Sequence, residues 1–129
     1  MKKYNIITPT GMKPKPDVYE WAVAEIMAGY FKSNVSFVER SSKKSPDILI
    51  MRTHTHWETK NIRGNGKFTI QNNLREASSQ SKHVVIGLSR TRMTTEQARS
   101  RTSFFLKKDP SKFKQVIIIT KKKEVLEIK

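Results

Sequence analysis

Two carboxylates and a lysine stand close together in the sequence around a short apolar run. Asp47 directly precedes the run Ile48–Met51, and Glu58 and Lys60 lie in the segment that follows a turn at Thr53–Thr55. Side chains alternate between the two faces of a strand, so Glu58 and Lys60 should project from the same face. A hairpin would therefore bring the side chains of Asp47, Glu58 and Lys60 to one place.

These residue types indicate a site for a divalent cation and a phosphate. Mg²⁺ (or Mn²⁺) is held by one or two carboxylates together with water and phosphate oxygens, which Asp47 and Glu58 can satisfy. The Lys60 ammonium can neutralise charge on the phosphate or orient an attacking water. The pattern predicts attack by water on a phosphate beside a metal held by the hairpin.

The composition favours a polyanionic partner. The chain has 129 residues, with 26 Lys and Arg against 11 Asp and Glu, which gives a formal net charge of +15. Nucleic acid is the commonest partner of so basic a surface, and an acidic membrane surface or an acidic protein is the alternative. The absence of cysteine excludes a disulfide framework and a thiolate zinc site. No apolar run is long enough for a membrane span or a signal peptide core.

Hydrophobic periodicity and turn residues predict three helices and six strands. Residues 1–16 are expected to form a basic N-terminal arm, with a short edge strand possible at 4–7, and residues 17–129 a single domain. The predicted order is α-β-β-β-α-β-α-β-β, which is typical of an α/β (α+β) fold with a mixed central sheet flanked by helices. The expected helices are 17–31, 69 to 80 or 81, and 94–107, and the expected strands are 35–39, 48–51, 56–62, 84–88, 116–120 and 125–128.

Pro46-Asp47 followed by Glu58-Thr59-Lys60 is similar to the PD-(D/E)XK nuclease motif. Further segments resemble, in order, the nuclease domain at the C-terminus of contact-dependent growth inhibition toxins of the CdiA type. The likeness runs from about Val18 to the end of the chain. The residues that carry it are Glu20, 45–48, 57–60, 69–74, Ala77, Gln80, Ser81 and 84–86.

The resemblance implies a PD-(D/E)XK endonuclease-like core and a metal-dependent endonuclease, with residues 17–129 as the nuclease domain. Some domains of this kind cleave transfer RNA, which makes a tRNase toxin the first expectation. It also implies that Glu20 lies near the metal, with Glu25 as the second choice, and that Gln80 helps to place water or metal. An acidic immunity protein is the implied partner. Action in the cytoplasm is expected, either as a stand-alone unit or as an effector domain delivered within a larger toxin.

Two basic segments are candidates for contact with nucleic acid. Arg63 and Lys67 bracket the loop R-G-N-G-K, whose glycines could let backbone amides approach a phosphate, although a flexible turn explains them equally well. Arg90 and Arg92 follow the predicted strand 84–88, and guanidinium groups suit bidentate phosphate contacts. A solvated basic loop is the alternative for that pair.

Other functions stay open at this point. A DNA endonuclease of a phage or mobile element would use the same residues. A non-catalytic nucleic-acid-binding module would keep the basic surface and lose the acidic residues. A metal-free ribonuclease could use His54 or His56 as the general base, and Glu58 would then be dispensable. A basic protein that binds a membrane or an acidic partner would have no nuclease activity.

Overall fold

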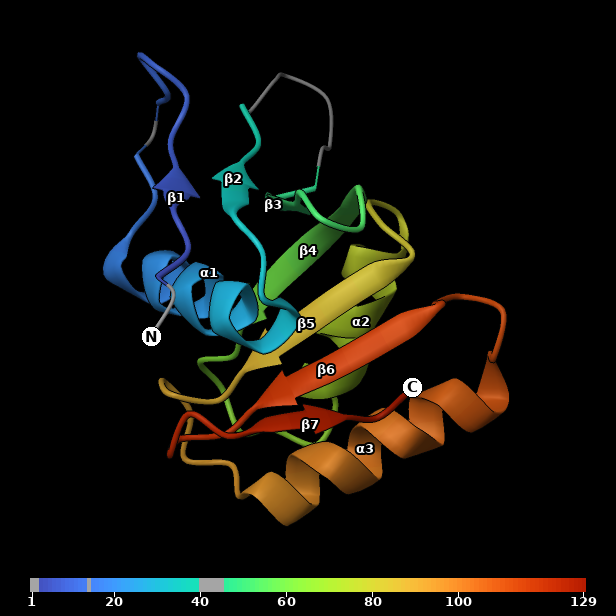
Figure 1. The fold of residues 1–129 in the computed structure, drawn as a ribbon. Coiled ribbons are helices and arrows are strands. Elements are labelled where there is room, and N and C mark those ends of the chain that lie inside the picture. Colours follow the sequence, from blue (N-terminus) through green and yellow to red (C-terminus); the bar gives the residue numbers. More distant parts are fainter. Residues whose placement is uncertain (1–2, 14, 40–45) are drawn as a thin grey trace.

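In the part of the chain that the structure describes, a seven-stranded sheet and three helices make up the fold (Figure 1). The computed structural model describes residues 3–13, 15–39 and 46–129, and the predicted basic loop 40–45, with Ser45 of the family segment, lies outside these ranges. The strands are β1 (Ile6–Ile7), β2 (Val35–Phe37), β3 (Ile48–Ile50), β4 (Thr55–Asn61), β5 (His83–Gly87), β6 (Gln115–Ile119) and β7 (Val125–Glu127). The helices are α1 (Val18–Phe31), α2 (Thr69–Ser78) and α3 (Thr95–Lys108).

The strand order in the sheet is the order in the chain, from β1 to β7. Strand β1 pairs in parallel with β2, and β2, β3 and β4 form an antiparallel meander. Strands β4, β5 and β6 are parallel, and β7 returns antiparallel to β6. Parallel neighbours need a crossover, which α2 supplies between β4 and β5 and α3 supplies between β5 and β6.

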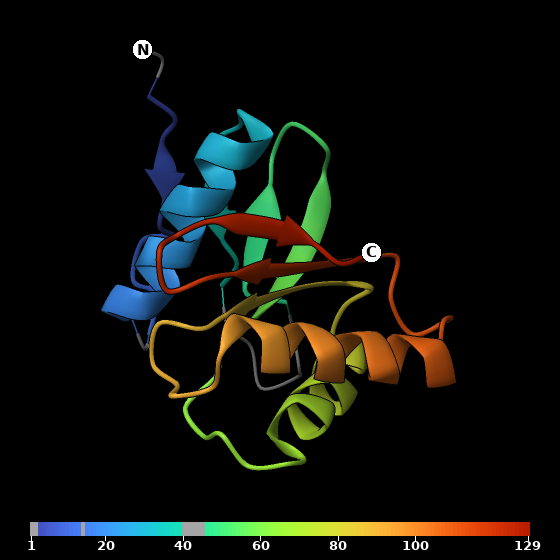
Figure 2. The same cartoon turned by 90° about the horizontal axis from the view of Figure 1, so that it is seen from below.

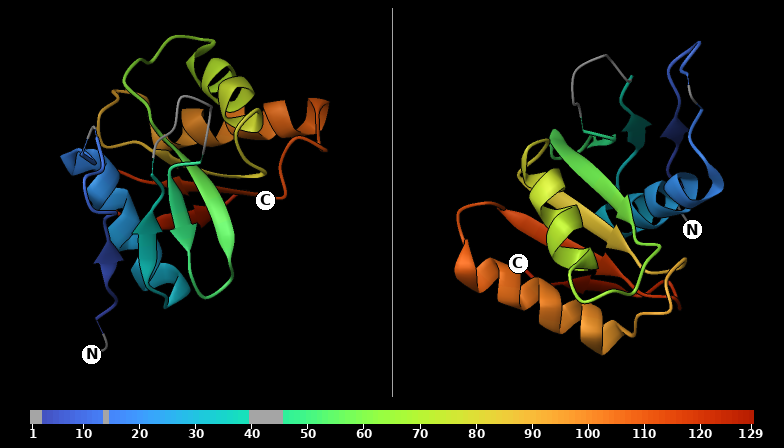
Figure 3. Two further views of the ribbon diagram at one scale, coloured as in Figure 1. Left: turned by 90° about the horizontal axis from the view of Figure 1, so that it is seen from above. Right: turned by 180° about the vertical axis from the view of Figure 1, so that it is seen from behind.

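The helices cover opposite faces of the sheet (Figures 2 and 3). Helix α1 buries Val23, Ala24 and Met27 in a core that includes Trp57 of β4 and Val85 of β5. Helices α2 and α3 pack on the other face, over a second core. Because side chains alternate along a strand, β5 contributes to both cores. The second core includes Ile62, Ile70, Leu74, Ala77, Val84, Ile86, Val116 and Ile118.

Helix α1 begins where the sequence predicts. Asp17 is the N-cap, and its carboxylate accepts a hydrogen bond from the Glu20 backbone N–H at 2.8 Å. The Glu20 side chain accepts in return from the Asp17 N–H at 3.1 Å, which completes a capping box. The helix ends at Phe31, and the C-cap residue Lys32 adopts the left-handed conformation with φ 51°.

The predicted mixed sheet with flanking helices is confirmed, with one strand more than the predicted order contains. Strand β1 comes from the segment predicted as a basic arm, so this segment contributes an edge strand at Ile6–Ile7 and buries Met12. Within the described ranges, no helix is long and apolar enough to cross a membrane.

Candidate functional site

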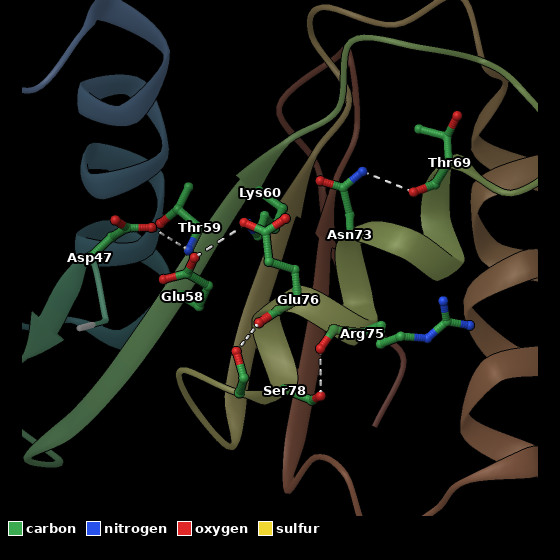
Figure 4. A network of polar contacts seen from close by, with 10 residues as sticks. Asp47, Glu58, Thr59, Lys60, Thr69, Asn73, Arg75, Glu76 and Ser78 are labelled. Atoms are coloured by element: carbon green, nitrogen blue, oxygen red, sulfur yellow. Dashed lines mark hydrogen bonds and ion pairs between the residues drawn. The ribbon is translucent and has the colours of Figure 1, made fainter. Parts of the chain in front are cut away.

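Asp47 and Glu58 face each other across the β3–β4 hairpin (Figure 4). The register pairs Ile48 with Trp57, which sets Asp47 opposite Glu58 one step earlier. The Asp47 backbone N–H donates to the Trp57 carbonyl at 3.1 Å, and the Thr59 backbone N–H donates to Asp47 Oδ2 at 2.9 Å. The hairpin backbone therefore fixes the Asp47 carboxylate beside Glu58.

Glu58 is buried in an environment that disfavours its charge. Only 3% of the residue is exposed, and burial, followed by the neighbouring Asp47 charge, raises the pKa of the Glu58 carboxyl from 4.5 to about 8. Its hydrogen bond with Asp47 acts in the same direction, whereas the Lys60 ammonium lowers the pKa. Near neutral pH the two carboxylates thus hold a proton that a cation could replace.

Lys60 lies between two glutamates. Its Nζ is 3.5 Å from Glu58 Oε2 and 2.8 Å from Glu76 Oε1, and the Lys60 side chain is 13% exposed. Glu76 comes from α2 and has a side chain that is 57% exposed. Glu76 was not predicted from the sequence, although the predicted helix would place it on one face with Gln80, four residues later.

Gln80 completes the group from just beyond the end of α2. The helix ends at Ser78, slightly earlier than predicted, so Gln80 lies in the turn that follows. Its amide is assigned with the nitrogen toward Glu58, since the opposite orientation would set the amide oxygen against the carboxylate. The nitrogen then donates to Oε2 at 2.6 Å and to Oε1 at 2.7 Å. Asp47, Glu58, Lys60, Glu76 and Gln80 form a contiguous polar group, called here the carboxylate–lysine cluster.

Glu20 has a different position from the cluster residues. It is the third residue of α1, where its side chain belongs to the capping box with Asp17. Among the residues that the structure describes, no group of three or more His, Asp or Glu side chains is arranged to hold a metal. Glu20 therefore does not join Asp47 and Glu58 in a three-ligand set here, and its role at a metal stays a prediction. Glu25 is exposed on the same helix.

The glycine-rich loop lies beyond the far end of β4. Arg63 and Lys67 are both exposed there. The loop is fixed to the α3 side of the molecule, because the Thr91 hydroxyl donates to the Gly64 carbonyl at 2.7 Å and Arg101 Nη1 donates to the Gly66 carbonyl at 3.3 Å. The loop is thus a held turn whose basic side chains remain accessible.

Arg90 and Arg92 follow the end of β5, at the same end of the sheet as the glycine-rich loop. The Arg90 guanidinium lies over the Tyr19 ring, with Cζ 4.2 Å from the ring centroid, and Arg92 is exposed. Glu58 precedes the end of β4 at Asn61 by three residues, or about 10 Å along the strand. The predicted nucleic-acid residues therefore follow the C-terminal ends of β4 and β5, beyond the carboxylate–lysine cluster along these strands.

Fold and site together define a small basic α/β domain with a paired-carboxylate centre on a strand hairpin. A family model described as the contact-dependent growth inhibition CdiA C-terminal domain matches residues 43–125, which is more than half of the chain. The chain therefore belongs to this family of toxin domains, as its sequence resemblance implied.

A solved structure supports the same fold. The chain is similar to a chain of the CdiA-CT/CdiI toxin and immunity complex from Burkholderia pseudomallei, with a TM-score of 0.63 and 16% sequence identity. The similarity covers 97% of this chain and 98% of that chain, and at this identity it establishes a shared fold. No curated protein sequence matches the chain.

Proposed function

We propose that this domain is a metal-dependent endonuclease of the PD-(D/E)XK type that hydrolyses phosphodiester bonds in RNA, with transfer RNA as the first candidate substrate. The observation that carries the proposal is the convergence of Asp47, Glu58, Lys60 and Gln80 on one face of the hairpin. The choice of RNA rests on the resemblance to toxin domains that cleave transfer RNA. The net charge of +15 is suited to either nucleic acid.

The cluster suits a hard divalent cation such as Mg²⁺ or Mn²⁺. Two adjacent carboxylates that share a proton offer oxygen ligands at the cost of releasing that proton. Mg²⁺ commonly takes one or two carboxylates and fills its other positions with water and phosphate oxygens. When bound, such a cation lowers the pKa of a water molecule and stabilises negative charge on the phosphate.

The other residues of the cluster have separate roles in this proposal. The Lys60 ammonium lies 3.5 Å from the Glu58 carboxylate, so a phosphate held at Glu58 would lie beside it. Lys60 would then donate to the phosphate oxygens as charge develops on them. Glu76 positions Lys60 through the 2.8 Å ion pair. Gln80 orients the Glu58 carboxylate by donating to it. Arg63, Lys67, Arg90 and Arg92 would contact phosphates farther along the strand.

A protein partner also follows from the family and the charge. The similar chain of known structure belongs to a toxin and immunity complex. By analogy, we expect an acidic immunity protein that covers part of the basic surface and blocks access of nucleic acid. The domain would then act in the cytoplasm of the cell that receives it.

The test is cleavage by the purified chain of transfer RNA, single-stranded DNA and plasmid DNA, with Mg²⁺ and with EDTA. Glu58→Gln and Asp47→Asn keep the side-chain shapes while removing charge, so both should abolish turnover. Glu96→Gln removes an equal charge from an exposed position on α3 and should cleave as the parent does.

The outcomes separate the competing functions. Cleavage that persists in EDTA and is lost in His56→Ala would indicate a metal-free ribonuclease. Undiminished cleavage by Asp47→Asn or Glu58→Gln would overturn the proposed site. Preference for DNA over RNA would retain the chemistry and change the substrate.

A further inference from the structure

A shallow cavity lies beside the carboxylate–lysine cluster, where the β3–β4 turn meets the start of β5. It has a volume of about 440 Å³. Its lining includes Gln80, which belongs to the cluster, and Pro46, which directly precedes Asp47. We call it the hairpin recess, defined by Pro46, His54, His56, Gln80, Lys82 and Lys114. It lies toward the start of β4, whereas Arg63 and Arg90 lie toward the far ends of β4 and β5.

Two lysines are held next to each other at the recess. The Lys114 backbone N–H donates to the Lys82 carbonyl at 2.7 Å, so these residues directly precede the paired starts of β5 and β6. Like charges on neighbouring strands repel. The described residues that line the recess include histidines and no Asp or Glu to offset this repulsion. The Lys82 ammonium donates to the Ser111 carbonyl at 3.0 Å, and a bound anion would offset the repulsion that remains.

Hydrogen bonds and a ring contact hold the floor of the recess together. The Ser81 hydroxyl donates to the His56 carbonyl at 2.7 Å and accepts from the His83 N–H at 3.0 Å, which connects the end of α2 to β4 and β5. The His83 ring packs on Trp57 with centroids 5.1 Å apart. In the described part of the chain, His83 Nδ1 is buried without a hydrogen-bond partner, although His83 lines the recess. That nitrogen is closed to solvent, so it belongs to the packed floor of the recess and not to its open surface.

His56 links the recess to the cluster. Residues two apart on a strand share a face, so His56, Glu58 and Lys60 follow one another on the same face of β4 at intervals of about 7 Å. A polynucleotide that presents one phosphate to Glu58 and Lys60 would place a neighbouring nucleotide at the recess.

We propose that the hairpin recess binds the nucleotide next to the scissile phosphate, with Lys82 and Lys114 contacting its phosphate group. The proposal rests on the proposed nuclease function and extends it, because it gives the substrate strand a path. The strand passes from the recess, across the carboxylate–lysine cluster, toward the glycine-rich loop.

The experiment measures binding separately from cleavage. Fluorescently labelled transfer RNA and a single-stranded DNA of equal length are titrated with the Glu58→Gln protein in EDTA, at several salt concentrations. The recess variant adds Lys82→Gln and Lys114→Gln. The matched control adds Lys107→Gln and Lys122→Gln, two exposed lysines outside the recess. Thermal unfolding checks that all three proteins are folded.

Two lost phosphate contacts predict a definite salt effect. For a single strand, the slope of log affinity against log salt should become shallower by about 1.4 in the recess variant. If the proteins bind equally at 1 M salt, this slope gives about 25-fold weaker binding at 0.1 M salt. A recess variant that matches the control in slope and affinity overturns the inference.

Cleavage assays use the protein with its native Glu58, with and without the recess substitutions. They distinguish this inference from the proposed function. If the parent cleaves with Mg²⁺ and the recess substitutions change neither binding nor cleavage, the recess proposal fails alone. If the parent cleaves nothing while the recess substitutions still weaken binding, the proposed chemistry fails and the recess remains a nucleic-acid site.

Discussion

The substitution Glu58→Gln should stabilise the metal-free protein, increasingly so as the pH rises. In the unfolded chain this carboxyl ionises near its usual pKa of 4.5, whereas in the folded protein its pKa is about 8. Between these values folding takes up a proton, so the free energy of unfolding of the parent should fall as the pH rises. At about 1.4 kcal/mol per pKa unit, the loss reaches at most about 5 kcal/mol by pH 8.

The Glu58→Gln protein lacks this loss, since glutamine is neutral in both states. Its advantage over the parent should therefore grow from pH 4.5 to pH 8 and then level off. Urea denaturation in EDTA at low salt, at unit steps of pH, measures the free energy of unfolding without adding ions. Glu25→Gln removes the same charge from an exposed position and corrects for the change in net charge.

A difference between Glu58→Gln and the parent that stays constant from pH 4.5 to pH 8 would refute the reasoning. A constant offset alone would indicate only the altered contacts with Lys60 and Gln80. If the stability advantage of Glu25→Gln over the parent also grew with pH, the effect would be due to overall charge.

Three other substitutions test separate contacts. Gly87→Ala should lower the free energy of unfolding by about 1–3 kcal/mol, because the added Cβ would lie 2.4 Å from Asn61 Oδ1. In an Asn61→Ala background most of this loss should disappear, and urea denaturation measures the loss in both backgrounds. Equal costs in both backgrounds would contradict this. Asp17→Ala should lower stability by about 1 kcal/mol, and Asp17→Asn by less, since asparagine also caps helices; thermal unfolding compares them. Glu76→Gln should lower kcat more than it raises KM, and should have little effect in a Lys60→Met background, whereas additive effects would show that Glu76 acts independently.

The sequence was sufficient for the hairpin and for most elements of the sheet. Continuous apolar runs and the capping residues Asp17 and Thr94 are local signals, and the structure retains both caps. Strand β1 was harder to predict because it has only two residues, and its pairing with Val35 depends on a partner far along the chain. An isolated Ile-Ile pair between polar residues carries little periodicity.

The cluster could be predicted only in part. Register along a hairpin sets Asp47 opposite Glu58, so spacing alone was informative there. Glu76 was missed because an exposed helical glutamate is normally a solvated charge, and only the packing of α2 against β4 brings it to Lys60. The capping role of Glu20 follows from its spacing of three residues from Asp17, whereas its place near a metal is implied by the family resemblance and stays a prediction.

The agreement between chain order and sheet order has a consequence for how the domain assembles. Each strand can be laid down beside its immediate predecessor, and none has to be inserted between two strands that are already joined. The antiparallel junctions β3–β4 and β6–β7 close over short turns, whereas each parallel junction closes over a helix, and the entropic cost of closure grows only slowly with this length. After unfolding, the sheet can therefore form again without opening any strand pair already made.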